Sequence, residues 1–123
     1  MKFVGIDIGS TCAKTVVLDE AGEPENLFVI PTGWSSFDAL EKIRKQLLEA
    51  GVSDTDAYTV STGYGRKAVP FAQKQVTEIT CHGKGACFLG GEDLTVIDIG
   101  GQDTKVILVR NGRVVDFIMN DKC

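Results

Sequence analysis

The chain has 123 residues, of which 43% are hydrophobic and 24% are charged, a balance typical of a single soluble globular domain. Its 13 basic and 17 acidic residues give a net charge of −4, which argues against sequence-independent binding of nucleic acid. Because no apolar run approaches the roughly 20 residues of a membrane span, and Asp7 interrupts the apolar N-terminus of a signal peptide, we expect a cytoplasmic protein.

The first predicted elements are a β-hairpin and a third strand. An apolar strand ends at Ile6-Asp7-Ile8-Gly9, and after the turn Lys14 precedes a second apolar strand over residues 15–18. A turn at residues 21–23 then leads to a third strand over residues 26–30. The beginning of the chain is therefore predicted to be three consecutive strands with an acidic residue at the first turn.

Helices and strands are predicted to alternate in the middle of the chain. Ser35, Ser36 or Asp38 can cap a helix whose apolar residues recur at helical spacing. The elements predicted there are, in order, this helix up to Gly51, a strand over residues 57–60, a short helix before Pro70, a weak strand over residues 76–79 and a helix over residues 81–89.

The end of the chain repeats its beginning. Ile97-Asp98-Ile99-Gly100 repeats Ile6-Asp7-Ile8-Gly9 91 residues later, and Lys105 repeats Lys14 at the same offset. Asn111-Gly112 is a strong hairpin signal before a last strand. The predicted order is βββαβ(α)βαβββ without a linker, which is an α/β domain.

Each of the two repeated turns combines exposed backbone N–H groups with a carboxylate. Such a turn can hold anionic oxygen atoms, and two of them facing each other would hold a polyphosphate from both sides. Since carboxylates repel phosphate, we expect Asp7 and Asp98 to hold Mg²⁺ through water. The candidate nucleotide-binding residues are Gly9, Ser10, Thr11, Lys14, Gly100, Gly101, Gln102 and Asp103, and the candidate catalytic residues are Asp7, Asp98 and Gln102.

Several of these residues have a purely structural alternative. A single Asp-x-Gly at a strand end is often only a tight turn, but two copies in register favour nucleotide binding. Gln102 or Asp103 is a candidate for positioning an attacking water, whereas Lys105 in particular can be structural. For His82, the only histidine, we expect packing or hydrogen bonding at a helix start rather than metal ligation.

The motifs G-I-D-I-G-S-T and I-D-I-G-G-Q-D resemble the two phosphate motifs of the superfamily of actin, sugar kinases and heat-shock chaperones. That superfamily has a ribonuclease-H-like fold with a mixed sheet. The words S-T-G-Y-G-R, E-I-T-C-H-G and M-N-D-K-C also resemble the ATPase activators of 2-hydroxyacyl-CoA dehydratases and their relatives, the ATPase subunits of benzoyl-CoA reductase. The resemblance runs in order along the whole chain, and M-N-D-K-C is its most specific part.

This resemblance implies an ATPase that is coupled to electron transfer. Members of the family bind ATP or ADP and are homodimers with one [4Fe–4S] cluster between the subunits, which makes Cys123 a cluster ligand. Four thiolates bind such a cluster, and two-fold symmetry halves the number that each chain supplies. Reduced ferredoxin or flavodoxin is the implied electron donor, and a CoA-ester dehydratase or reductase is the implied acceptor.

The resemblance covers only the N-terminal half of the family. Its second cluster cysteine and its adenosine-binding glycine motif come after M-N-D-K-C and have no counterpart in this sequence. We therefore expect residues 1–123 to be a single N-terminal actin-like ATPase domain, in which residues 95–123 open a truncated second lobe. Such a chain should have little or no ATPase activity by itself.

Two alternative functions stay open. A small-molecule kinase of the same superfamily, acting on a sugar or a carboxylate, needs a general-base carboxylate near its acceptor, and M-N-D-K-C has no role in it. The other alternative is a non-catalytic nucleotide-binding or assembly fragment that pairs with another chain.

Overall fold

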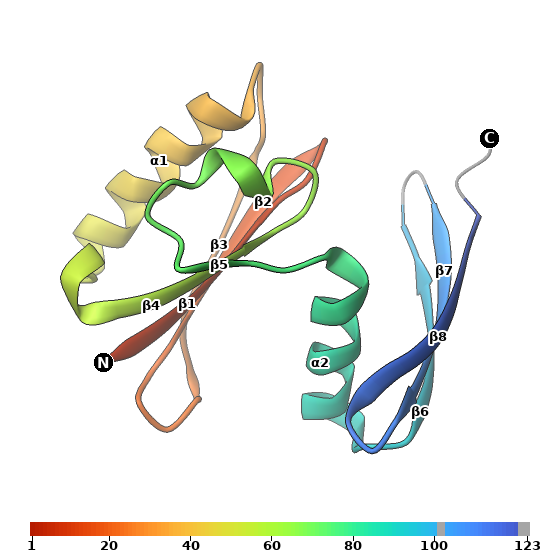
Figure 1. The fold of residues 1–123 in the computed structure, drawn as a ribbon. Coiled ribbons are helices and arrows are strands. Elements are labelled where there is room, and N and C mark those ends of the chain that lie inside the picture. The colour runs from red at the N-terminus through yellow and green to blue at the C-terminus, as the bar shows by residue number, and fades with distance from the viewer. Residues whose placement is uncertain (101–102, 121–123) are drawn as a thin grey trace. The chain divides into compact units, whose positions relative to one another are not determined.

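Two separate β-sheets organise the chain (Figure 1). The computed structural model describes residues 1–100 and 103–120. It divides into two compact units, Met1–Val76 and Thr77–Cys123. The first unit holds a five-stranded sheet in the order β3-β2-β1-β4-β5, and the second holds a three-stranded sheet in the order β6-β7-β8.

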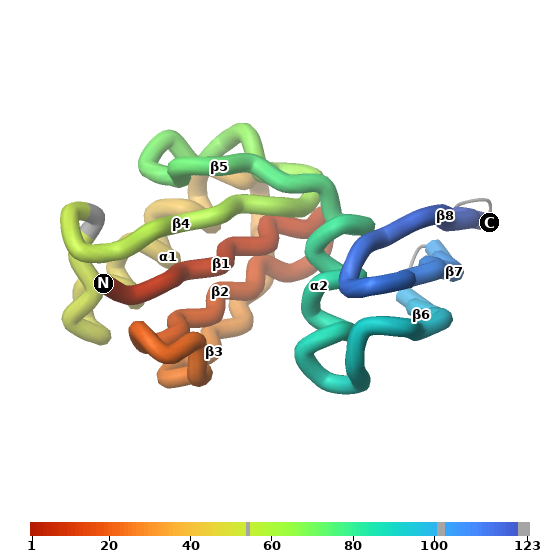
Figure 2. Tube along the Cα trace, turned by 60° about the horizontal axis from the view of Figure 1, so that its bottom comes forward, coloured from red at the N-terminus to blue at the C-terminus, as the bar shows by residue number. Residues whose placement is uncertain are grey.

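The sheet of the first unit is mixed. Strands β1 (Lys2–Ile8), β2 (Cys12–Leu18) and β3 (Pro24–Pro31) pair antiparallel in sequence order. Strand β4 (Ala57–Thr62) pairs parallel with the other edge of β1, and β5 (Lys74–Gln75) pairs parallel with β4 (Figure 2). Because β1 and β4 are parallel, their carboxyl ends meet at the same edge of this sheet.

Helix α1 (Ser36–Glu49) begins and ends as its sequence predicts. Ser35 is the N-cap, and its Oγ accepts a hydrogen bond of 3.1 Å from the backbone N–H of Asp38. The helix ends before Gly51, whose φ of +78° lies in the left-handed region that glycine adopts readily.

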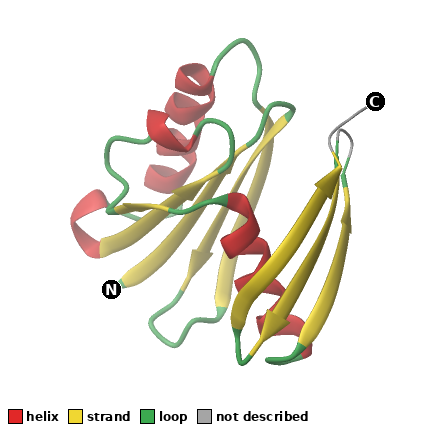
Figure 3. Ribbon diagram, turned by 45° about the vertical axis from the view of Figure 1, so that its right-hand side comes forward, coloured by secondary structure: helices red, strands yellow, loops and turns green. Residues whose placement is uncertain are grey.

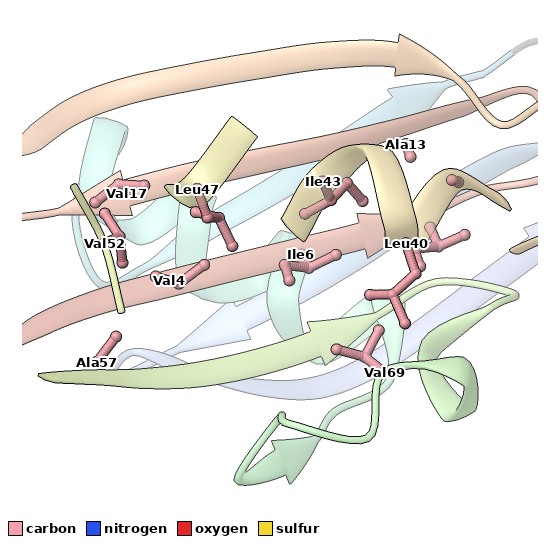
Figure 4. Packing of buried hydrophobic residues seen from close by; sticks show 12 residues of the cluster. Val4, Ile6, Ala13, Val17, Leu40, Ile43, Leu47, Val52, Ala57 and Val69 are labelled. Atoms are coloured by element: carbon pink, nitrogen blue, oxygen red, sulfur yellow. The ribbon is translucent and has the colours of Figure 1, made fainter. Parts of the chain in front are cut away.

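The hydrophobic core of the first unit lies between α1 and one face of its sheet (Figure 4). Fully burying one Leu or Ile side chain stabilises a fold by about 1.5–3 kcal/mol, so this packing holds the helix firmly on the sheet. The buried hydrophobic residues are Val4, Ile6, Ile8, Ala13, Val17, Ala39, Leu40, Ile43, Leu47, Val52, Ala57 and Val69.

The second unit is a three-stranded antiparallel sheet with one helix. Helix α2 (Glu78–Gly90) packs against β6 (Leu94–Ile99), β7 (Thr104–Arg110) and β8 (Arg113–Asn120) (Figure 3). The turn between β7 and β8 has positive φ at both Asn111 and Gly112 (54° and 74°), as a two-residue hairpin turn requires. In the part of the chain that is described, no helix is both long and apolar enough to cross a membrane.

The predicted element order is correct, but two local predictions differ from the structure. The short helix before Pro70 is a 3₁₀ turn, η2 (Arg66–Ala68), and a second such turn, η1 (Asp54–Asp56), precedes β4. The prediction of a weak strand over residues 76–79 is wrong, because Ile79, one of its two apolar residues, lies in α2. Val76 still donates a backbone hydrogen bond to Ser61 (2.9 Å) and extends the pairing of β5, and the helix begins two residues later.

Candidate phosphate-binding site

Asp7 and Lys14 face each other across the first hairpin. They are register partners of β1 and β2, and Lys14 Nζ lies 3.6 Å from Asp7 Oδ2. The Lys14 side chain is 51% exposed and that of Asp7 is 27% exposed. A solvated ion pair of this length contributes at most about 1 kcal/mol, so Lys14 is available to a ligand.

Hydrogen bonds fix the turn between β1 and β2. Gly9 N–H donates to the carbonyl of Cys12 (3.0 Å), and the Thr32 hydroxyl donates to the carbonyl of Gly9 (2.6 Å). Since the N–H of Gly9 serves the turn itself, Ser10 and Thr11 are the better donors for an anion. Both of these residues are exposed.

The loop after β4 closes over the end of β1, a contact that sequence reasoning missed. Gly65 N–H donates to the carbonyl of Ile8 (2.8 Å). Gly63 has a φ of +90°, and a Cβ there would clash with Asp7 Oδ1 and lie 2.6 Å from the Ile8 carbonyl oxygen. Thr62, the register partner of Asp7, has a buried hydroxyl without a hydrogen-bond partner among the described residues. In the sequence, the signal for this close approach was the pair Gly63 and Gly65 in the loop that follows β4.

Asp98 and Lys105 repeat this register in the second hairpin, but Lys105 is buried. Its side chain is 6% exposed, and its Nζ lies 2.8 Å from Asp103 Oδ1 and 3.5 Å from Asp98 Oδ2. Burial by itself lowers the pKa of Lys105, but the hydrogen bond to Asp103 and the charges of Asp103, Asp98 and Glu78 together raise it. Lys105 is thus a charged residue with a structural role. From the sequence, this role was the alternative to phosphate binding.

His82 of α2 also contacts Asp98. Its Nδ1 lies 3.1 Å from Asp98 Oδ2, and the two side chains are 35% and 32% exposed. His82 thus lies near the start of α2 beside an acidic side chain, and its expected packing or hydrogen-bonding role there stays a prediction.

The predicted site residues form one group in each unit. Asp7, Gly9, Ser10, Thr11 and Lys14 come together at the first turn. At the second turn, Gly100 N–H donates to the carbonyl of Asp103 (2.8 Å), and Lys105 joins Asp103 to Asp98. The predicted residues Gly101, Gln102 and Cys123 lie outside the described residues.

Taken each within its own unit, the carboxylates of Asp7 and Asp98 are both of the kind that suits a Mg²⁺ ion held mostly by water and phosphate. Both are partly exposed, at 27% and 32%. Within residues 1–100 and 103–120, no three His, Cys, Asp or Glu side chains converge on a possible metal position. Mg²⁺ usually keeps several waters and takes only one or two carboxylates, so it does not require such a cage.

Comparison with known proteins decides the family. The sequence profile of the BadF/BadG/BcrA/BcrD ATPase family matches residues 4–123. The chain belongs to this ATPase family. The resemblance seen in its motifs is thereby confirmed.

Two similar proteins are named as dehydratase activators. The (R)-2-hydroxyglutaryl-CoA dehydratase activating ATPase of Acidaminococcus fermentans is 42% identical over 122 residues, which cover 98% of this chain and 47% of that protein. The activator of lactoyl-CoA dehydratase of Anaerotignum propionicum is 42% identical over 125 residues, which cover 100% of this chain and 48% of that protein. The chain spans about half the length of the curated relatives it matches.

Solved structures show the same fold. Component A of the A. fermentans (R)-2-hydroxyglutaryl-CoA dehydratase has a TM-score of 0.88 at 40% identity and is matched over 100% of this chain and 48% of its own. The activator of the 2-hydroxyisocaproyl-CoA dehydratase from Clostridium difficile, with bound ADPNP, has a TM-score of 0.86 at 39% identity, over 100% and 47% of the two chains. The predicted actin-like ATPase fold class is confirmed.

Proposed function

We propose that this chain carries the phosphate-binding hairpins of an ATP-dependent reductive activator, which passes an electron to a 2-hydroxyacyl-CoA dehydratase or a related CoA-ester reductase. The observation that carries the proposal is the repeated register of Asp7 with Lys14 and Asp98 with Lys105, in a member of an ATPase family. The similarity to dehydratase activators over nearly the whole chain supports the choice of partner.

Nucleotide binding is assigned to both turns. The exposed ammonium of Lys14 would offset phosphate charge, while the N–H and hydroxyl groups of Ser10 and Thr11 would donate to phosphate oxygens. Asp7 and Asp98 would hold Mg²⁺ through water, and the ion when bound neutralises charge on the phosphates. Because Lys105 already engages Asp103, Gln102 is the better candidate for positioning the attacking water.

The redox part of the proposal rests on resemblance to the activator family. Cys123 would supply a thiolate to a [4Fe–4S] cluster shared by two subunits of a homodimer, and this group supplies one-electron chemistry when bound. Ferredoxin or flavodoxin would be the electron donor. The described cysteines Cys12, Cys81 and Cys87 are free thiols and are not assigned to the cluster.

Calorimetric titration with ADPNP, with Mg²⁺ or with EDTA, tests the nucleotide-binding part. We expect binding that requires Mg²⁺ and that weakens about tenfold in Lys14→Met, since a charge-assisted contact to phosphate is worth about 1.5 kcal/mol. Lys45→Met is the matched control, because Lys45 is an exposed lysine on the outer side of α1. Equal binding in EDTA, or an unchanged affinity of Lys14→Met, would contradict the proposal.

A further inference from the structure

We propose that Thr62 is a further ligand-binding residue of the first hairpin, whose hydroxyl accepts a hydrogen bond from a water of the Mg²⁺ ion when nucleotide binds. The inference rests on the nucleotide-binding function proposed above. It assigns a role to a residue of the word S-T-G-Y-G-R, which lies outside the two phosphate motifs.

The pairing of β1 with β4 places Thr62 beside Asp7. The two residues are register partners at the carboxyl ends of parallel strands, so their side chains lie on the same face of the sheet. That face is the one opposite α1, because Ile6 and Ile8, on either side of Asp7, pack in the core. A hydroxyl and a carboxylate also share Mg²⁺ in P-loop NTPases. Thr62 and Asp7 are thus a suitable pair of side chains for a hydrated Mg²⁺ ion.

The hydroxyl of Thr62 is buried and has no hydrogen-bond partner among the described residues. Two other hydroxyls at the same end of the sheet are paired. Ser61 Oγ donates to the carbonyl of Arg66 (2.8 Å). The Thr32 hydroxyl donates to the carbonyl of Gly9 (2.6 Å). Because an unpaired buried polar group destabilises a fold and is uncommon in native proteins, the Thr62 hydroxyl indicates a partner that the described chain does not supply.

The backbone after Thr62 is fixed, whereas the Asp7 side chain is held loosely. A Cβ on Gly63 would clash with Asp7 Oδ1 and with the Ile8 carbonyl, so the chain there lies directly against β1. The ion pair of Asp7 with Lys14 measures 3.6 Å, which is longer than a hydrogen bond. When phosphate attracts Lys14, the carboxylate can turn toward the ion and uncover the hydroxyl beside it.

Thr15 provides a matched comparison within the same sheet. Its hydroxyl is also buried and also has no partner in the part of the chain that the structure describes. Thr15 is the register partner of Ile6 and therefore lies on the face that α1 covers, opposite to Asp7. Valine has the shape of threonine without the hydroxyl. Substitution by valine should affect nucleotide binding at Thr62 and not at Thr15.

Valine substitutions at the two positions separate ligand binding from folding. The variants are Thr62→Val, Thr62→Ser, which keeps the hydroxyl, and the control Thr15→Val. Affinity for ADPNP is measured by calorimetry on the full chain, with Mg²⁺ and with EDTA, and urea denaturation without nucleotide measures stability. Methyl NMR spectra of the wild type follow the γ-methyl groups of Thr62 and Thr15 during the same titrations.

If the Thr62 hydroxyl serves the ligand, affinity and stability diverge in Thr62→Val. The Mg²⁺-dependent affinity should fall about tenfold, as for loss of one hydrogen bond to a charged group, while the urea midpoint stays equal or rises. Thr62→Ser and Thr15→Val should bind within about threefold of wild type. The Thr62 methyl signal should move with Mg²⁺ and ADPNP but not with ADPNP in EDTA, and the Thr15 signal should stay in place. Should Thr62→Ser fail to fold, Thr62→Val and the methyl signals decide the question.

Three results would overturn the inference. If Asp7→Asn loses the Mg²⁺ dependence but Thr62→Val binds like wild type, only the role of Thr62 is wrong. Equal losses of affinity in Thr62→Ser and Thr62→Val, or losses that are as large in EDTA and accompany a lower urea midpoint, mean that Thr62 only packs. A wild-type chain without Mg²⁺-dependent binding at millimolar ADPNP overturns the nucleotide-binding function and the role of Thr62 together.

Discussion

The two hairpins have the same register and a similar sequence, yet they use their lysines differently. Lys14 lies 3.6 Å from Asp7 with 51% of its side chain exposed, whereas Lys105 is 6% exposed and contacts both Asp103 and Asp98. A repeated motif therefore does not guarantee repeated chemistry. The first hairpin leaves its cation exposed to solvent, and the second uses its cation to hold two carboxylates in place.

The difference follows from which face of each hairpin is covered by a helix. In the first unit, α1 covers the face with Ile6 and Ile8, and Asp7, between them, points to the opposite face together with its cross-strand partner Lys14. In the second unit, the face of β7 that packs against α2 is the one with Lys105. The same alternation of side chains thus exposes one lysine and buries the other.

The largest expected effect is the difference in stability between variants that lack one or the other lysine. Lys105→Met leaves two partly buried carboxylates without their cation and should lower the free energy of unfolding by about 3 kcal/mol. Lys14→Met should lower it by less than about 1 kcal/mol, because its ion pair is solvated. Urea denaturation followed by circular dichroism measures both, and hydrogen exchange of β7 and β2 amides assigns each loss to its unit. Equal losses in the two variants would break the comparison.

A second prediction concerns the loop after β4, which lies against Asp7 in the first hairpin. Gly63→Ala places a methyl group against Asp7 Oδ1 and the Ile8 carbonyl, whereas Gly22→Ala, at a similar φ of +86°, meets nothing within 4 Å. Both variants carry the strain of a left-handed residue, about 1–2 kcal/mol. Overpacking should add about 2 kcal/mol at Gly63 alone. If urea denaturation gave the same stability for both variants, the loop after β4 would not be packed against Asp7.

A smaller effect is expected at alkaline pH. The pKa of Lys105 is raised in the folded protein, so its stabilising contribution is fully present below the unfolded value of about 10.4 and is lost as the pH rises through the folded value. The stability difference between wild type and Lys105→Met should therefore be smaller at pH 11 than at pH 8. Urea denaturation at the two pH values measures it, and an unchanged difference would mean that the charge of Lys105 is not what stabilises the second unit.

The parts of the fold that local signals determine could be predicted from the sequence. Ser35 and Gly51 bound α1 because a side-chain acceptor and a left-handed residue are local requirements, and Asn111-Gly112 forms the predicted turn for the same reason. The start of α2 could not be placed, since Val76 and Ile79, which lie on either side of it, suit a strand equally well. The proximity of Asp7 and Lys14 could be predicted from the register of the hairpin alone.

Contacts between segments distant in the sequence were beyond such reasoning. The burial of Lys105 depends on which face α2 covers, and no pattern within β7 encodes that choice. The approach of Gly63 to Asp7 depends on the parallel pairing of β4 with β1, which brings residues 56 positions apart to one edge. In both places tertiary packing, rather than local preference, sets the chemistry of the carboxylate.

The most direct test follows the ammonium groups themselves. The side-chain ¹⁵N signals of Lys14 and Lys105, assigned through Lys14→Met and Lys105→Met, are recorded while ADPNP and Mg²⁺ are added to the full chain. The Lys14 signal should move with nucleotide concentration, and the Lys105 signal should stay in place because its partners are Asp103 and Asp98. A Lys14 signal that does not respond, or a response confined to Lys105, would contradict the proposal that Lys14 contacts phosphate while Lys105 is structural.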